Sequence, residues 1–296
     1  MADRNLPHWR SILFVPVLNE RFVSGAPTRG ADCIQLDLED AIPPDSKQEA
    51  RERVGAVADQ LHGAGCDVIV RINRPWRMAL ADIAAAVRPS VTALTLPKVP
   101  GAGHVDAICE VLEDIERERG MEIGHTRLIV MIETAAALSQ MEAIARASQR
   151  IIGVIVGAED LAVSMGMRPT HRSLLVPNVQ AVAAARAAGC MPLGFVGSVA
   201  GYSDLDTYRD LIREARELGF TGAFAIHPNQ VPVLNAEFAP SQEEVEAAQA
   251  LIEAFEAGRR EGRGAISHLG KMVDLPVVEQ AEAILAAHGR FASRRL

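Results

Sequence analysis

Carboxylates follow two apolar segments of the chain, and their type and position indicate metal chemistry. Residues 128–132 form an apolar run that ends at Glu133, and residues 151–157 form a second run that leads to Glu159 and Asp160. Unbroken apolar runs of this length are typical of strands buried on both faces. Carboxylates at the ends of neighbouring strands can share a divalent cation, and oxygen ligands favour Mg²⁺, with Mn²⁺ possible. A simpler role for Glu133, in the first turn of the following helix, stays open.

The ends of the other expected strands add further polar residues to this group. Carboxylates dominate the full set, which is Pro16, Asp37, Glu39, Asp40, Arg71, Asn73, Lys98, Glu133, Glu159, Asp160 and His227. Carboxylates held close together repel one another unless a cation lies among them, which favours the metal interpretation. Arg71 lies inside an apolar strand and therefore needs an anionic partner. It could pair with Glu39 or Asp40, or bind a substrate carboxylate through two parallel hydrogen bonds, and the two roles are compatible.

Two members of this set have competing interpretations. His227 precedes Pro228 and is expected to be a structural hydrogen-bonding residue at a turn rather than a metal ligand. Lys98 ends the fourth strand, where a lysine could form a Schiff base, but the carboxylates favour a metal-dependent reaction. The sequence contains no H-E-x-x-H, G-x-S-x-G or P-loop motif, so it gives no support to zinc-peptidase, serine-hydrolase or P-loop chemistry.

Segments with strand character alternate with helical segments along most of the chain. The expected strands are residues 11–16, 33–38, 68–73, 91–96, 128–132, 151–157, 191–196 and 222–226. This alternation predicts a TIM (β/α)8 barrel, in which the loops after the strands build the active site. A doubly wound sheet is the alternative, but no G-x-G-x-x-G follows the first strand. Helices are expected at 135–148 and 179–188, with Pro177 in the loop before the second, and Asp45 or Ser46 is expected to cap another at 47–62.

The residues from Pro240 onward lie outside the barrel pattern. Ser241 with Glu244 predicts a capped helix that runs to about residue 257, followed by a flexible link at Gly258, Gly262 and Gly264. The next expected elements are an extended or irregular segment at 269–276 and a last helix at 277–287. We therefore expect a barrel domain over residues 1–239 and a helical extension over 240–296. The extension would act as a lid or as an arm that packs on a neighbouring subunit.

Composition and charge argue against several classes of partner. The 296 residues carry 30 basic and 38 acidic side chains, and no long basic run is present that would bind nucleic acid. No apolar run approaches the ~20 residues that span a membrane, and residues 1–10 lack the apolar core of a signal peptide. The four cysteines are widely spaced without a C-x-x-C pair, which predicts reduced thiols in a cytoplasmic protein.

Short motifs that are specific when taken together follow one another along nearly the whole chain. They occupy residues 10–11, 13–16, 30–32, 36–41, 47, 50–51, 71–73, 96–99, 132–135, 157–161, 226–231 and 272–276. With these motifs the chain resembles the citrate lyase β-subunit-like proteins of the HpcH/HpaI aldolase group, relatives of malyl-CoA and citramalyl-CoA lyases. The resemblance implies a TIM barrel that binds Mg²⁺ directly through Glu133 and Asp160, with Glu39 and Asp40 around the metal's waters.

The same resemblance assigns roles to further residues. Arg71 is expected to contact the substrate's carboxylate or carbonyl oxygen, and Pro97 and Lys98 are expected to lie at the substrate. Asp274 would act as the acid/base from a C-terminal arm that reaches over a neighbouring subunit's site. Proteins of this kind are usually trimers or hexamers, so a homotrimer or homohexamer is expected.

The chain departs from the family pattern at four positions. Val17 stands where a glycine is expected, Gly25 and Ala223 where lysines are usual, and Pro177 where an arginine is usual. The lost cations bear most directly on the binding of a coenzyme A phosphate.

The expected activity is Mg²⁺-dependent carbon–carbon cleavage of a 3-hydroxyacyl-CoA, such as malyl-CoA or citramalyl-CoA, to an acyl-CoA and a 2-oxo acid. One alternative is a metal-dependent aldolase that acts on free hydroxy or 2-oxo acids without coenzyme A, which the departures favour slightly. The other is a non-catalytic or accessory lyase-like subunit. The intact set of Glu133, Asp160, Arg71 and Asp274 argues against that second alternative, because a binding scaffold has no need of all four.

Overall fold

The chain divides into two compact units, Met1–Ala236 and Glu237–Leu296. A computed structural model describes residues 6–198 and 204–293. The expected site residues other than Asp274 belong to the first unit, and Asp274 belongs to the second. Among the described residues, no helix combines the length and the apolar character needed to cross a membrane.

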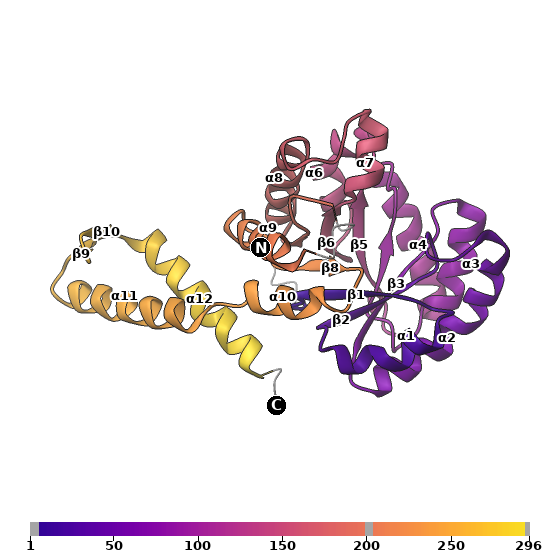
Figure 1. Cartoon of the computed structure of the whole chain (residues 1–296), viewed down its shortest axis with the longest axis horizontal. Helices are drawn as coiled ribbons and strands as arrows, with labels where there is room; N and C mark the ends of the chain where they lie inside the picture. The colour runs from indigo at the N-terminus through magenta and orange to yellow at the C-terminus, as the bar shows by residue number, and fades with distance from the viewer. Residues whose placement is uncertain (1–5, 199–203, 294–296) are drawn as a thin grey trace. The chain divides into compact units, whose positions relative to one another are not determined.

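Eight parallel strands form the centre of the first unit (Figure 1). They are β1 Ser11–Pro16, β2 Cys33–Asp37, β3 Asp67–Arg71, β4 Ala93–Leu96, β5 Arg127–Ile132, β6 Ile151–Val156, β7 Met191–Leu193 and β8 Ala223–Ala225. Their order is β7-β6-β5-β4-β3-β2-β1-β8. A parallel bridge between Leu193 and Gly222, with a 2.8 Å hydrogen bond from Gly194 N–H to Gly222 O, joins the two ends of the sheet. The predicted TIM-type barrel is therefore confirmed, and it is nearly closed.

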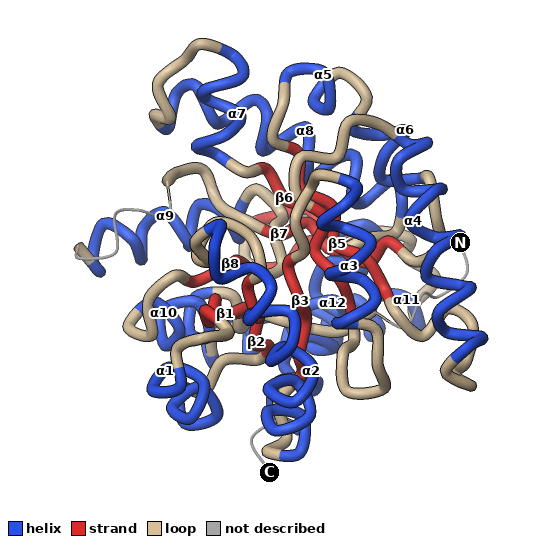
Figure 2. Tube along the Cα trace, turned by 90° about the vertical axis from the view of Figure 1, so that its right-hand side faces the viewer, coloured by secondary structure: helices blue, strands red, loops and turns tan. Residues whose placement is uncertain are grey.

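Helices surround this barrel, as the blue segments around the red strands show (Figure 2). They are α1 Glu20–Gly25, α2 Lys47–Gly63, α3 Trp76–Ala86, α4 Ala102–Glu118, α5 Ala135–Leu138, α6 Met141–Arg146, α7 Ala158–Met165, α8 His171–Ala188, α9 Leu205–Glu217 and α10 Gln230–Glu237, with 3-10 turns η1 Ala26–Arg29 and η2 Pro44–Ser46. Each longer helix buries one apolar face, as α4 does with Val105, Ile108 and Leu112. The short helix α10, which precedes the second unit's long helices, was not predicted.

Three expectations about the helices were wrong. The helix expected at 135–148 is broken into α5 and α6, because the side chains of Ser139 and Gln140 both donate to the Ala136 carbonyl and compete with the backbone ladder. Pro177 lies inside α8 and not in a loop. Because proline has no backbone N–H, one carbonyl of this helix lacks its usual hydrogen-bond donor. Ser46 stands before α2, but its side chain makes no capping hydrogen bond.

The helix α8 tolerates its internal proline because other parts of it are strongly stabilised. A capping box between Thr170 and Ser173 satisfies its first N–H groups. Its buried face, which includes Leu174, Ala181 and Ala185, adds apolar contacts along the rest of its length.

Apolar side chains from the strands form the core inside the barrel. The cluster comprises Trp9, Ile12, Cys33, Ile69, Ala93, Ile129, Met131, Ile152, Ile155, Met191, Leu193 and Phe224, with Leu6 and Phe14 packed against it. One polar pair lies among the strands, in which Thr95 Oγ1 donates a 2.5 Å hydrogen bond to Gln35 Oε1. This packed interior is the rigid support on which the polar residues at the strand ends stand.

The second unit contains two long helices and a hairpin. These elements are α11 Gln242–Arg260, β9 Ile266–His268, β10 Lys271–Val273 and α12 Leu275–Ser293. The predicted capping box is present, with Glu244 N–H donating to Ser241 Oγ at 3.1 Å and Ser241 N–H donating to Glu244 Oε2 at 2.7 Å. The core of the unit is formed by Phe255, Val273 and Val278.

One expectation about this unit was wrong. Gly258 is not part of a link, because α11 continues through it to Arg260. A glycine is needed there because a Cβ atom would lie 2.3 Å from Ile266 Cγ2 of the hairpin. The segment at 269–276, expected to be extended or irregular, contains the hairpin turn, the extended strand β10 and the start of α12. Leu269 and Gly270 form that turn with φ angles of 49° and 77°, as a tight two-residue hairpin requires.

Candidate functional site

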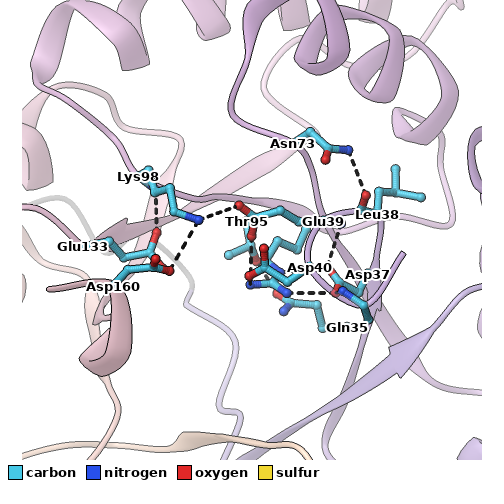
Figure 3. Close-up of polar contacts among 12 residues, drawn as sticks. Gln35, Asp37, Leu38, Glu39, Asp40, Asn73, Thr95, Lys98, Glu133 and Asp160 are labelled. Atoms are coloured by element: carbon cyan, nitrogen blue, oxygen red, sulfur yellow. Dashed lines mark hydrogen bonds and ion pairs between the residues drawn. The ribbon is translucent and has the colours of Figure 1, made fainter. Parts of the chain in front are cut away.

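A cavity of about 730 Å³ opens at the carboxyl ends of the barrel strands. Eight of the residues expected at the strand ends line it: Pro16, Asp37, Asp40, Arg71, Glu133, Glu159, Asp160 and His227. Glu39 and Lys98 do not line the cavity themselves, but their side chains contact Arg71 and Asp160, which do (Figure 3). The topology of the barrel therefore brings the sequence-predicted group together at one opening.

Arg71, at the end of β3, is held by Asp37, which was expected at the strand ends but not as the partner of this arginine. Its Nε and Nη2 each donate a 2.8 Å hydrogen bond to the carboxylate of Asp37 at the end of β2. Its remaining nitrogen, Nη1, lies 2.9 Å from Glu39 Oε2 and 3.3 Å from Asp40 Oδ2. The ring of Phe14 lies 5.0 Å below the guanidinium carbon. Asp37 thus fixes the orientation of Arg71 and leaves Nη1 facing the other acidic residues.

The Asp37–Arg71 pair stays ionised although it is buried. Burial would raise the pKa of Asp37, but the hydrogen bonds and charge of Arg71 outweigh it and hold that pKa below its usual range. Burial would likewise lower the pKa of Arg71, but Asp37 outweighs it and the pKa is raised. The two pairings left open for Arg71, with Glu39 and with Asp40, are both present, but Asp37 is its bidentate partner.

Lys98 links the carboxylates on the other side of the site. Its Nζ lies 3.1 Å from Glu39 Oε1 and 3.4 Å from Asp160 Oδ2. Its backbone N–H donates a 2.6 Å hydrogen bond to Glu133 Oε2. Burial opposes the charged form of Lys98, but Glu39 and the other two carboxylates outweigh it and raise the pKa of the ammonium. A charged lysine of this kind is poorly suited to Schiff-base formation, which needs a neutral amine.

Glu133, directly after β5, is the most perturbed carboxylate of the site. Its pKa is raised to about 7, first by burial and further by the charges of Glu39 and Asp160, against the opposing hydrogen bond from the N–H of Lys98. The absence of a side chain at Gly157 leaves room for Glu133, since a Cβ atom at that position would lie 2.4 Å from Glu133 Cγ and 2.5 Å from its Oε1. A buried carboxylate in a space kept open by glycine is suited to a cation.

Asp160 is the better placed of the two acidic residues that follow β6. It lies in the first turn of α7, and 42% of its side chain is exposed toward the cavity mouth. The side chain of Glu159 instead accepts a 2.5 Å hydrogen bond from Ser198 Oγ. Asp160 therefore faces Lys98 and Glu133, whereas Glu159 is engaged elsewhere.

The donor set of Glu133 and Asp160 fits a hard divalent cation that completes its shell with other oxygens. Among the described residues, no three carboxylate, histidine or cysteine side chains are arranged to hold an ion by themselves. Mg²⁺ commonly binds through one or two carboxylates and keeps water and substrate oxygens as its remaining ligands. The two predicted ligands therefore match Mg²⁺ better than a metal that needs a full protein cage.

A second group of residues holds the backbone that carries Glu39. Lys47 Nζ donates to the carbonyls of Leu38 at 2.7 Å and Glu39 at 2.6 Å, and Asn73 Nδ2 donates to Leu38 O at 2.8 Å. Asp82 on α3 accepts hydrogen bonds from the backbone and side chain of Asn73. Asp82 was missed by sequence reasoning, because a helical aspartate away from the strand ends carries no signal. Lys47 was recognised only as part of a motif.

The remaining expected residues are placed as follows. The Nδ1 atom of His227 accepts a 3.2 Å hydrogen bond from the N–H of Asn229, so His227 takes part in a turn as expected. Pro97 is buried at the end of β4, beside Lys98. Asp274 follows β10 in the second unit, where its carbonyl accepts a hydrogen bond from the N–H of Val277. Its acid/base role stays a prediction.

Two arginines stand at the rim of the cavity near one of the departures. A Cβ atom at Gly25 would lie 3.7 Å from Arg29 Nη2, and both Arg21 and Arg29 line the cavity. Pro177 and Ala223 are both buried. A cation is therefore present beside Gly25, supplied from a different position of the chain.

Comparisons with known proteins agree with this geometry. Residues 10–228 match the family described as HpcH/HpaI aldolase/citrate lyase. The citrate lyase subunit beta of Haemophilus influenzae is 33% identical over 93% of this chain and 95% of its own length. The L-malyl-CoA/beta-methylmalyl-CoA lyase of Cereibacter sphaeroides is 33% identical over 91% of this chain and 90% of its own. Both relatives are carbon–carbon lyases.

A solved structure extends the likeness to three dimensions. The protein CitE of Mycobacterium tuberculosis, in complex with magnesium, acetoacetate and coenzyme A, superposes with a TM-score of 0.75. It is 27% identical and covers 97% of this chain and 99% of its own. With a matching family over most of the barrel and relatives above 30% identity along nearly the whole length, this chain belongs to the HpcH/HpaI aldolase/citrate lyase family.

Proposed function

We propose that this protein is a Mg²⁺-dependent carbon–carbon lyase that cleaves a 3-hydroxyacyl-CoA, such as malyl-CoA or citramalyl-CoA, to an acyl-CoA and a 2-oxo acid. The observation that carries the proposal is that Glu133 and Asp160 lie together at one cavity wall, both in contact with Lys98. Two carboxylates so close together favour a cation between them. The relatives' activities and the magnesium in the CitE structure support the same assignment.

Glu133 and Asp160 would hold the metal, which is Mg²⁺ with Mn²⁺ as the alternative. When bound, the ion supplies Lewis-acid stabilisation of negative charge on a substrate oxygen. Arg71 would bind the substrate carboxylate or carbonyl oxygen through Nη1, which Asp37 does not engage and which would exchange its contacts with Glu39 and Asp40 for the substrate. Glu39 and Asp40 would hydrogen-bond the waters of the site.

The reaction needs one proton acceptor and no redox partner. The bond that breaks joins the hydroxyl-bearing carbon to the carbon beside the thioester. The hydroxyl proton leaves to a base, which we assign to Asp274 of a neighbouring copy, and the hydroxyl-bearing carbon becomes the carbonyl of the 2-oxo acid. The electron pair of the broken bond passes to the thioester fragment, whose enolate then takes up a proton from the protonated Asp274 to give the acyl-CoA.

Coenzyme A is favoured over a free acid by the cavity rim. Arg21 and Arg29 line the opening, and guanidinium groups are suited to phosphate. They would replace the cations that Gly25, Pro177 and Ala223 do not provide. The alternative activity, cleavage of free hydroxy or 2-oxo acids without coenzyme A, would not require arginines at the opening of the cavity.

We further propose that residues 240–296 form an arm that packs on a neighbouring subunit in a homotrimer or homohexamer. Leu269, Met272 and Leu275 flank Asp274 and are exposed in the isolated chain, although they are large and apolar. Covering them with a second copy would remove apolar surface from water and deliver Asp274 to that copy. Light scattering on the purified protein tests this, and a monomer at micromolar concentration would contradict it.

Cleavage assays on the purified protein with Mg²⁺ test the activity itself. Release of a 2-oxo acid from malyl-CoA or citramalyl-CoA supports the proposal, and the metal requirement is checked with a chelator. Cleavage of free hydroxy acids with no action on thioesters would establish the runner-up instead. An inactive protein that co-purifies with a larger complex would establish an accessory subunit.

A further inference from the structure

The floor of the cavity is apolar and lies inside the barrel, below the polar residues. Four side chains form it, namely Phe14 on β1, Met131 on β5, Ile155 on β6 and Phe224 on β8. We call these four side chains the apolar floor. Met131 and Ile155 are paired residues on the neighbouring strands β5 and β6. The ring centroids of Phe14 and Phe224 lie 5.3 Å apart.

The strand register places this floor one layer below the polar wall. Phe14 is the strand partner of Gln35, two residues before Asp37. Met131 likewise precedes Glu133 by two residues on the same side of β5. The apolar floor thus lies directly beneath the carboxylates and Arg71, at the closed end of the cavity rather than at its mouth.

Two side chains of the apolar floor keep a small exposed area where they line the cavity. Ile155 retains 9% of its surface and Met131 retains 7%, whereas Ile129, on the same strand as Met131, has none. Barrel interiors are normally filled by layers of side chains. The whole cavity, including the part that a thioester would enter, has a volume of about 730 Å³, which is in the range of sites for drug-sized ligands.

Arg71 of the polar part of the cavity stacks on Phe14 of the apolar floor. The guanidinium of Arg71 lies 5.0 Å above the ring of Phe14. A 2-oxo acid whose carboxylate binds Arg71 therefore has its remaining carbon chain beside the apolar floor. The thioester fragment must leave through the mouth, so it does not compete for this space.

We propose that the substrate's 2-oxo acid fragment carries an apolar substituent, the methyl group of pyruvate or a longer chain, which packs on the apolar floor. This inference rests on the proposed lyase activity and specifies its substrate class. The balance of the reaction is unchanged by the substituent. The hydroxyl proton goes to the base, the carbon that bears the substituent becomes a carbonyl, and the thioester fragment receives the electron pair and a proton.

Calorimetric titration of the full-length protein in excess Mg²⁺ tests this with pyruvate, 2-oxobutanoate and 2-oxopentanoate. Each added methylene that becomes buried should tighten binding by about fourfold, so that Kd falls along the series. Binding of pyruvate with no gain for the longer acids would overturn this inference and leave the lyase activity standing. Failure of all three acids to bind would overturn both.

Two substitutions locate the effect. Ile155→Phe fills the space above the apolar floor. It should raise the Kd of 2-oxopentanoate by a factor at least about tenfold larger than that for pyruvate. Val163→Phe adds the same bulk at an 83% exposed position on α7 and should leave the ratio of the two Kd values unchanged. If Ile155→Phe does not fold, Phe224→Leu widens the space and should shift the preference toward longer acids. Equal changes for both acids in either floor variant would overturn the inference.

Discussion

The backbone N–H of Lys98 donates a 2.6 Å hydrogen bond to the carboxylate of Glu133. Lys98 adopts a φ angle of 49°, a conformation that few residues other than glycine adopt and that costs conformational energy. Because of this turn, the N–H of Lys98 points to Glu133 while its ammonium lies near Asp160 and Glu39. One residue therefore contacts both proposed metal ligands.

Replacing Lys98 by methionine should strengthen metal binding. In the metal-free protein the ammonium neutralises Asp160 and Glu39, and it repels any divalent cation beside them. Removing it should lower the Kd for Mg²⁺ by about fivefold, the equivalent of roughly 1 kcal/mol of repulsion. Titration of Mg²⁺ followed by thermal unfolding measures this. Lys98→Arg keeps the charge and should stay near the wild-type Kd, and an unchanged or higher Kd in Lys98→Met would contradict the arrangement.

The glycine at position 157 should be required for the metal site. In Gly157→Ala the new methyl group meets Glu133 and forces its side chain to move, so Mg²⁺ should bind at least about tenfold more weakly. Overpacking of this kind also costs about 1–3 kcal/mol of unfolding free energy. Gly103→Ala is the matched control, since a Cβ there meets nothing within 4 Å. Wild-type Mg²⁺ affinity in Gly157→Ala would show that Glu133 is not a ligand.

The Asp37–Arg71 pair should contribute strongly to stability. Asp37→Asn leaves the buried guanidinium without its bidentate partner, which is expected to cost about 3–5 kcal/mol. Urea unfolding of the variant measures the loss. Asp114→Asn removes one partner of the exposed pair with Arg117 and should cost no more than about 1 kcal/mol. Similar losses in the two variants would mean that Glu39 and Asp40 hold Arg71 equally well.

Protonation of His104 should make the protein less stable at acidic pH. Burial, with the charge of Arg74, lowers the pKa of His104 from 6.5 to about 4 in the folded protein. Between these values the unfolded chain binds a proton that the folded protein does not, so this contribution to stability is lost as the pH falls from about 6.5 to about 4. His104→Gln should flatten this part of the pH dependence in urea unfolding, and an unaltered slope would rule out the assignment.

The sequence predicted the barrel because eight largely apolar segments alternate with helical ones, and two of the longest of them, at β5 and β6, are unbroken apolar runs buried on both faces. The placement of Glu133, Glu159 and Asp160 at one rim could be predicted for the same reason, since parallel strands bring their carboxyl ends together, whereas the choice of Asp160 as a ligand came from the family resemblance. The pairing of Arg71 with Asp37 could not, because three carboxylates follow the same strand end and only side-chain geometry distinguishes them. The position of Pro177 inside α8 is a case in which a capping box and a buried face outweigh local preference.

The assignment of Mg²⁺ to Glu133 and Asp160 is tested most directly by one comparison. Release of a 2-oxo acid from a 3-hydroxyacyl-CoA is measured with Mg²⁺ for the wild type, for Glu133→Ala and for Glu142→Ala, an exposed glutamate on α6. We predict that Glu133→Ala loses activity on the order of 10³-fold and no longer responds to Mg²⁺, while Glu142→Ala matches the wild type. Retained Mg²⁺-dependent cleavage in Glu133→Ala would contradict the proposed site.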